Sequence, residues 1–248
     1  MKIFIPTKGR PDRQRTSALL IEAGVDHVLV TEDNPGLYEN PHLVLSVPPM
    51  SLVQKRQWIV EQNKDKFIMM DDDLRFRHRA MDSDQFKRCG PRQIQDMIAH
   101  IEGALEFCAH VGLTDEFMCT SRPRGYLKFG RYNGLLAYNP KFWRSLPKNK
   151  WPRFRLNLNH DHDFALQLYA LGFHPAIFCD YTKSSKFYAK GGLHAHRRAA
   201  DEKKAHEILA QHWPHLVSVV PSKTSLSGYR IAVKWKKAFE QTQRKGFL

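Results

Sequence analysis

Three consecutive aspartates, Asp71, Asp72 and Asp73, directly follow the short apolar run from Phe67 to Met70. An uninterrupted apolar run of this length indicates a strand that is buried on both faces, as in a parallel sheet. Ligands of such sheets bind beyond the carboxyl ends of the strands, where these acids would lie. Carboxylate oxygens suit Mg²⁺ or Mn²⁺, which can bridge a protein to phosphate groups. The stretch therefore predicts a divalent-cation site, with a solvated acidic turn as the alternative.

A turn rich in basic residues follows the first predicted strand. It has the sequence PTKGRP and begins at Pro6. Gly9 would let the backbone approach a ligand closely, and Lys8 and Arg10 can contact phosphate oxygens. Because this turn also lies at the carboxyl end of a strand, we expect it to lie near the acidic stretch.

Further candidate site residues lie on or beside predicted helices. Lys55 and Arg56 precede the acidic strand and form a basic pair within reach of the same ligand, unless they make surface salt bridges. Asp161 and Asp163 stand in NHDHDF, at the start of a helix, where the helix dipole stabilises carboxylates. The flanking histidines favour acid–base or ligand chemistry over a simple N-cap. His194, in GGLHAHRR, could supply a nitrogen ligand to the cation.

Positive charge is concentrated in two segments of a chain whose net charge is +14. Residues 121–155 contain ten Lys and Arg and no acid, and residues 222–248 contain seven against one Glu. A localised excess of this kind suggests a polyanionic partner. Aromatic residues interleave with the first segment and could stack on an exposed base, although some must belong to the core. The candidate nucleic-acid contacts are Arg122, Arg124, Lys128, Arg131, Arg153 and Arg155.

Composition places few other limits on the protein. The 248 residues are 42% hydrophobic, which is enough for a sizeable core, and no apolar run approaches the length that a membrane-spanning helix needs. The four cysteines show no CxxC spacing, which favours free thiols in a reducing compartment. The opening residues read as a strand and are too short in apolar character for a signal peptide. We therefore expect a cytoplasmic protein.

The pattern of elements predicts an α/β domain with a mostly parallel sheet flanked by helices. A strongly periodic helix begins at Pro91, and its apolar positions continue as far as Val111. From about 117 onward the pattern changes to short strands and basic loops, with one further helix over about 162–171. Strands are expected over residues 2–5, 27–30, 43–47 and 67–70.

In this order, the motifs resemble those of a GT-A nucleotide-sugar glycosyltransferase. The shared pattern is IPT.GRP, SL..KR..I, a buried strand running into DxD, and a carboxylate pair that opens a helix. The FIPTKGR opening, the KR…MMDDD block and the basic charge further resemble the phage TET-associated DNA-base glycosyltransferases. The resemblance implies a GT-A, Rossmann-like domain over 1–221, with a nucleotide-sugar half (1–116) and an acceptor half (117–221). Residues 222–248 would form a basic C-terminal extension.

The resemblance also implies roles for individual residues. Asp71 and Asp73 would hold Mn²⁺ or Mg²⁺, with His194 as a third ligand. Asp161 would be the catalytic base and Asp163 the nearby alternative, although His160 stands where Glu is common. The nucleotide site would be lined by Thr7, Lys8, Gly9, Arg10, Asp33, Lys55, Arg56 and Asp72.

The implied reaction transfers a sugar from a UDP-sugar to DNA that contains a hydroxymethylated pyrimidine, foremost 5-hydroxymethylcytosine, in the cytoplasm of a phage-infected host. Two alternatives stay open at this point. One is a glycosyltransferase of the same fold that acts on a cell-surface glycan. The other is a metal-dependent protein that binds or hydrolyses nucleic acid.

Overall fold

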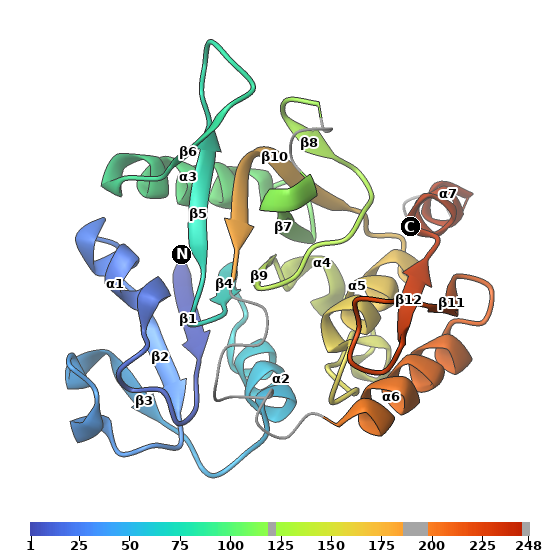
Figure 1. Cartoon of the computed structure of the whole chain (residues 1–248), viewed down its shortest axis with the longest axis horizontal. Helices are drawn as coiled ribbons and strands as arrows, with labels where there is room; N and C mark the ends of the chain where they lie inside the picture. The colour runs from blue at the N-terminus through green and yellow to red at the C-terminus, as the bar shows by residue number, and fades with distance from the viewer. Residues whose placement is uncertain (119–122, 186–197, 245–248) are drawn as a thin grey trace.

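The computed structural model describes residues 1–118, 123–185 and 198–244 (Figure 1). The strands are β1 (Lys2–Pro6), β2 (Val28–Thr31), β3 (Val44–Ser46), β4 (Phe67–Met70), β5 (Arg75–Arg79), β6 (Phe86–Arg88), β7 (His110–Asp115), β8 (Tyr126–Leu127), β9 (Leu135–Tyr138), β10 (Pro175–Ser184), β11 (Val217–Pro221) and β12 (Tyr229–Val233). The helices are α1 (Arg15–Glu22), α2 (Leu52–Gln62), α3 (Pro91–Ala104), α4 (Lys141–Arg144), α5 (His160–Ala170), α6 (Ala199–His212) and α7 (Trp235–Arg244).

The main sheet has the strand order β3-β2-β1-β4-β9-β7-β10-β5-β6, and β8 pairs with β10. The first four of these strands are parallel, and β7 and β10 are parallel to each other. Between the two groups, β9 runs antiparallel to both β4 and β7. This arrangement confirms the predicted mixed, mostly parallel α/β sheet. Because β9 runs the opposite way, its first residues lie at the edge where β4 and β7 end.

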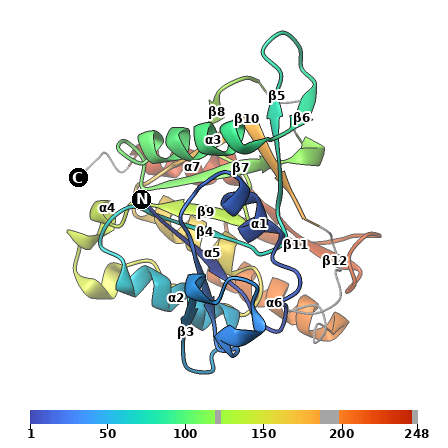
Figure 2. The same ribbon diagram turned by 90° about the vertical axis from the view of Figure 1, so that its left-hand side faces the viewer.

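Helices cover both faces of the sheet, as Figures 1 and 2 show. α1 and α3 pack on one face, and α2, α4 and α5 pack on the other. The central strand β4 contributes to both cores, because Ile68 and Met70 face α3 while Phe67 and Met69 face α5. All four side chains are at most 1% exposed, as expected of a strand with helices on both sides.

The C-terminal residues form a smaller unit on α5, which Figure 1 shows at the right of the molecule. β11 and β12 make an antiparallel hairpin, and α6 and α7 share a third core with α5 that includes Leu166, Leu209 and Ala238. The expected division between 221 and 222 falls in the connection of this hairpin. Residues 222–244 therefore pair with and pack on the preceding residues instead of extending away from them.

Three elements differ from the sequence-based expectation, and one of them is α6, where no helix was expected. The helix that begins at Pro91 ends at Ala104, and Val111 belongs to the buried strand β7. The connection from Leu105 to Ala109 is apolar except for Glu106, so the apolar pattern of α3 looked continuous with that of the buried β7. The hairpin of β5 and β6, directly after the aspartates, was not expected at all. None of the described helices is long and apolar enough to cross a membrane.

Candidate active site

The acidic stretch lies at the carboxyl end of β4, and Asp72 is turned toward the loop that follows β1. Its carboxylate accepts hydrogen bonds from the Thr7 hydroxyl at 2.7 Å and from Arg10 Nη1 at 3.1 Å. Thr16, at the start of α1, fixes the backbone of the same turn, because its hydroxyl donates to the Asp71 carbonyl at 2.6 Å and its backbone N–H donates to the Asp72 carbonyl at 3.1 Å. Asp72, which is 7% exposed, therefore joins the acidic stretch to the β1 loop.

The other two acids have different surroundings. Asp71 receives a hydrogen bond from Arg56 Nη2 at 2.6 Å on one oxygen, and its side chain is 37% exposed. Burial, followed by the charges of Asp71 and Asp72, raises the pKa of Asp73 to about 6. Repulsion among neighbouring carboxylates is what a bound cation would relieve. Asp71 and Asp73 thus keep oxygen atoms for a ligand, whereas both oxygens of Asp72 are already hydrogen-bonded.

The turn after β1 is joined to the end of β2. Gly9, in the left-handed region with φ +63°, donates its backbone N–H to Asp33 Oδ2 at 2.6 Å. The same oxygen accepts a hydrogen bond from the Tyr38 hydroxyl at 2.8 Å. Lys8 pairs with Glu32 at 2.5 Å, and its side chain stays 64% exposed. The predicted nucleotide-site residues of β1 and β2 are therefore together at one edge of the sheet.

Lys55 has a different position from the one expected of a phosphate contact. Its side chain is 1% exposed, and its ammonium group bonds the Thr7 carbonyl at 2.6 Å and forms an ion pair with Glu32. The lysine thus holds the β1 loop against the end of β2. Lys55 is therefore neither part of a surface salt bridge nor an exposed cation.

Arg56 connects the acidic stretch to the start of α5. One of its nitrogens binds Asp71, and the other contacts Nε2 of His160. Burial, followed by the charge of Arg56, lowers the pKa of His160 to about 4, so the imidazole is neutral. Arg56 thus places the N-terminus of α5 beside the acids of β4, although Arg56 and His160 are 104 residues apart in sequence.

Asp161 lies at the start of α5 and has few hydrogen-bond partners among the described residues. Its carboxylate accepts hydrogen bonds from the backbone N–H of His162 at 2.9 Å and from His162 Nδ1 at 3.0 Å. Burial would raise the pKa of Asp161, but the nearby His162, His160 and Arg56 outweigh it and hold the pKa well below its usual range. Asn159, the N-cap, is the only described non-glycine residue with positive φ, at 59°. Such a conformation is common at functional sites.

Asp163 is enclosed by hydrogen-bond donors. Its side chain is 0% exposed and binds Arg155 through two contacts, at 2.8 and 2.9 Å. Gln167 Nε2, at 2.9 Å, and Trp213 Nε1, at 2.8 Å, complete the set. These contacts join α5 to the preceding loop and to the end of α6. They favour a structural role for Asp163 and leave Asp161 as the better placed base.

Sequence comparison identifies the family. The family model described as TET-associated glycosyltransferase matches residues 1–192. The chain belongs to the TET-associated glycosyltransferase family. No curated protein matches the sequence. Among solved structures, a hypothetical transferase from Thermus thermophilus is 14% identical, with a TM-score of 0.34, over 58% of this chain and 67% of that chain. Similarity of that size carries no argument about function.

The glycosyltransferase presents its predicted nucleic-acid contacts in several places. Arg124 donates to the Ala80 and Ser83 carbonyls at the β5–β6 turn, at 3.1 and 2.9 Å. Lys128 and Arg153 are exposed. Arg131 lies 3.9 Å from Asp115, Arg155 binds Asp163, and Arg122 lies outside the described residues. Several of the aromatic residues of this segment are core, namely Tyr132, Tyr138, Trp143 and Phe154.

The predicted metal ligands of the glycosyltransferase lie only in part within the described residues. Within the described residues, no three His, Cys, Asp or Glu side chains come together as they would around a metal ion. His194 lies outside those residues, so its predicted role stays a prediction.

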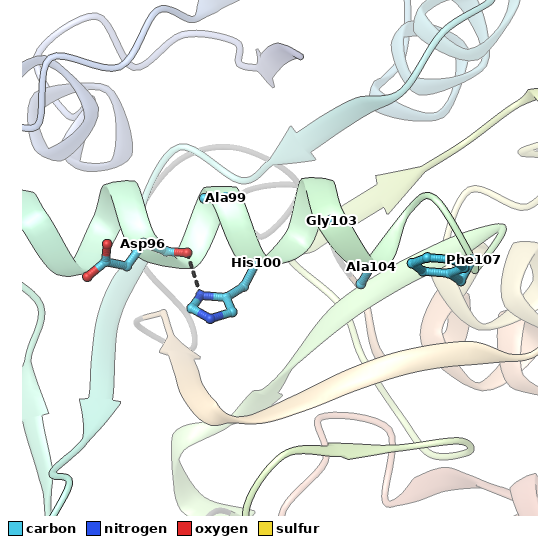
Figure 3. Close-up of a pocket in the computed structure, with 6 residues that line it drawn as sticks. All are labelled: Asp96, Ala99, His100, Gly103, Ala104 and Phe107. Carbon is cyan, nitrogen blue, oxygen red and sulfur yellow. Dashed lines mark hydrogen bonds between the residues drawn. The ribbon is translucent and has the colours of Figure 1, made fainter.

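The open hollow along α3 is a separate feature of the surface. It is lined by Asp96, Ala99, His100, Gly103, Ala104 and Phe107 (Figure 3), none of which belongs to the acidic stretch or to the neighbouring strand ends.

Sequence reasoning missed one group at this edge. Lys183, on β10, binds Asp115 at the end of β7 and Asn133 just before β9. Its side chain is 5% exposed. A lone lysine in YTKSSK has no spacing signal, and only the sheet order brings these three residues together. Gly134, next to Asn133, accepts a hydrogen bond from the Asp71 amide at 2.8 Å, which places the group beside the acids of β4.

Proposed function

We propose that this glycosyltransferase moves a pentose or hexose from a UDP-sugar to the hydroxyl of a 5-hydroxymethylpyrimidine in DNA, foremost 5-hydroxymethylcytosine, with the help of Mn²⁺ or Mg²⁺. The observation that carries the donor half of the proposal is the arrangement at the end of β4. There Asp72 is bound to Thr7 and Arg10 of the β1 loop, and oxygen atoms of Asp71 and Asp73 stay available. The family supports sugar transfer, and the charge distribution supports DNA as acceptor.

The residues present fit a divalent cation. Two carboxylates on one turn offer hard oxygen atoms, and the raised pKa of Asp73 reflects buried negative charge that lacks compensation. Arg56 already neutralises one oxygen of Asp71 at 2.6 Å, so a cation would bind from the other side of that carboxylate. When bound, such a cation neutralises the charge of a leaving diphosphate.

The side chains of the chain itself would perform the other steps. Arg10, near the acidic stretch, and Lys8, which is exposed, would contact phosphate oxygens and stabilise the leaving UDP. Asp161, which stays ionised, would take the proton of the attacking hydroxyl in an inverting reaction. In a retaining reaction, stabilisation of the leaving group would matter more and this base would matter less.

The C-terminal unit provides the best argument for a DNA acceptor. Trp235, which begins α7, stacks on the ring of His162, with centroids 5.8 Å apart, and His162 binds Asp161. Trp235 and His162 therefore connect the basic residues of this unit to the proposed base, Asp161. The exposed cations of its β11–β12 hairpin and of the start of α7 include Lys223, Arg230, Lys234, Lys236 and Lys237. Such a cluster would bind a phosphate backbone in a salt-dependent manner, while the target base enters the site.

Turnover measurements test the proposal directly. Purified protein with Mn²⁺ and a panel of UDP-sugars is incubated with DNA that contains 5-hydroxymethylcytosine, 5-hydroxymethyluracil or neither. We expect UDP release and a matching mass increase in the nucleosides of modified DNA alone. Transfer to a glycan acceptor but to no DNA would favour the cell-surface alternative. Cleavage of the DNA without sugar transfer would favour the hydrolytic one.

Asp73→Asn separates the cation site from the DNA surface. The variant removes a proposed cation ligand and no basic residue, so UDP release should fall at least about 100-fold while DNA affinity changes little. Asp82→Asn is the matched control, because Asp82 is exposed in the β5–β6 turn. Equal turnover in the two variants would contradict the assignment of Asp73.

A further inference from the structure

A buried polar group lies on the side of the acidic stretch that faces away from the β1 loop. Its centre is the Lys183 ammonium, which binds the carboxylate of Asp115 and the side-chain oxygen of Asn133. The three residues come from three strand ends, because Lys183 aligns with Asp115 in the β7–β10 register and Asn133 precedes β9. Lys183 and Asp115 have side chains that are 5% and 9% exposed, whereas Asn133 is half-buried.

Stability alone does not account for this group. Burying two charges costs desolvation free energy that their attraction commonly fails to return, and well-packed apolar side chains are often as stable. An ammonium group has three N–H donors, and Asp115 and Asn133 use two of them. A buried charged pair beside a candidate site is therefore a candidate for a role other than packing.

Gly134 shows what the ammonium group faces. A Cβ atom added to this glycine would lie 3.5 Å from Lys183 Nζ and 3.3 Å from Asp71 Oδ2. The ammonium group, the proposed cation ligand and the Leu74 side chain, 3.3 Å away, therefore border one point among the residues that the structure describes. The glycine has φ +68°, a conformation that disfavours other residues independently of space.

The order of strands matches the order of groups in the donor. The predicted nucleotide contacts lie at the ends of β2 and β1, the acidic stretch is at the end of β4, and the Lys183 group is at β9, β7 and β10. A UDP-sugar is linear: nucleoside, diphosphate, sugar. With the nucleoside at β2 and β1 and the diphosphate at β4, the sugar reaches the strands that come next in the sheet.

We propose that Lys183, Asp115 and Asn133 bind hydroxyl groups of the donor sugar and determine which sugar is transferred, an assignment that rests on the proposed function. Together the three side chains offer donors and acceptors, as sugar hydroxyls require. A phosphate is a poor ligand here, because Asp115 neutralises the lysine and would repel a second anion. The buried Lys183 therefore also differs from Lys8, whose side chain is 64% exposed.

Calorimetric titration of UDP and of UDP-sugars, each with Mn²⁺, tests this assignment. The panel is UDP-glucose, UDP-galactose, UDP-N-acetylglucosamine and UDP-xylose. We expect the wild type to bind one of these sugars more tightly than UDP. In Lys183→Met and Asn133→Ala, that preference should fall at least tenfold while the Kd for UDP stays within twofold. Lys87→Met is the control, because Lys87 is exposed on β6, and it should match the wild type.

A parallel loss of UDP and UDP-sugar affinity in both variants would overturn the assignment, because a merely structural lysine would act on both ligands. An unchanged preference in both variants would overturn it too. Asn133→Ala keeps the test decisive if Lys183→Met does not fold, since Asn133 is half-buried and uncharged. Wild-type protein that binds UDP but prefers no sugar refutes the sugar site alone. Wild-type protein that does not bind UDP at all refutes the proposed function itself.

Discussion

Substitution of Asp163 and Asp161 by asparagine should separate a structural carboxylate from a catalytic one. Asp163 accepts four hydrogen bonds, and every partner is a donor on Arg155, Gln167 or Trp213. An asparagine keeps one oxygen and must direct its NH₂ group at another donor. Asp163→Asn should therefore destabilise the fold without acting on the reaction.

The structure sets the size of this effect. Removing one partner of a buried ion pair costs about 3–5 kcal/mol. The Arg155 side chain is 41% exposed and can return to water, so we take about 2–3 kcal/mol as the expected loss. For a chain of this size, each kcal/mol lowers Tm by about 2–4 °C, which gives a decrease of about 4–12 °C. Asp161 has only His162 as a hydrogen-bond partner among the described residues, so Asp161→Asn should lower Tm far less.

The assay combines thermal unfolding with turnover at a temperature well below both Tm values. Folded Asp163→Asn should retain turnover within about threefold of wild type, and Asp161→Asn should lose about 100-fold or more if the reaction is inverting. Arg155→Met should lower Tm by a similar amount to Asp163→Asn, because it breaks the same pair. An Asp163→Asn variant with unchanged Tm and abolished turnover would refute this interpretation and restore Asp163 as the base.

Three further expectations concern the acidic stretch and the DNA surface. Gly134→Ala should cost about 1–2 kcal/mol and weaken Mn²⁺ binding, because its Cβ meets Asp71, and an unchanged Mn²⁺ affinity by titration would contradict this. In cation-free protein, Asp73→Asn should raise Tm at about pH 7.5 more than at about pH 4.5. The pKa of Asp73 in the folded protein, about 6, is above its value in the unfolded chain. The repulsion that destabilises the fold is therefore present above that pKa and is relieved as the pH falls. An equal shift at both pH values would refute that cause. Lys234→Glu combined with Lys236→Glu should reduce the slope of log K for DNA binding against log salt concentration by about 2. A slope equal to that of wild type, measured by fluorescence anisotropy, would exclude these lysines as phosphate contacts.

The half of the fold formed by residues 1–116 was the most predictable from sequence. The run from Phe67 to Met70 is wholly apolar because helices cover both faces of β4. This one signal indicated a buried parallel strand and, with it, that the aspartates lie at the carboxyl end of that strand. Gly9 was singled out because it would let the backbone approach a ligand, and the structure shows that it also has the left-handed conformation. These features depend on short-range patterns, which a sequence displays directly.

Features that depend on distant pairing were not predictable. Lys55 looked like an exposed cation, but the ends of β1 and β2 enclose it, and only the parallel pairing of those strands creates that enclosure. Asp163 was the alternative base in the sequence-based prediction, and its contact with Trp213, fifty residues later, could not be read from the sequence. Lys183 gave no signal, because its partners come from β7 and from the start of β9, which the sheet order alone makes its neighbours.

The most direct test of the central claim is sugar transfer to modified DNA. The protein, Mn²⁺ and each UDP-sugar are incubated with matched duplexes that contain cytosine or 5-hydroxymethylcytosine, and the digested nucleosides are weighed by mass spectrometry. We predict one added sugar on 5-hydroxymethylcytosine, none on cytosine, and none with Asp73→Asn. No transfer to any hydroxymethylated duplex, with a panel of donors that the protein binds, would contradict the DNA acceptor.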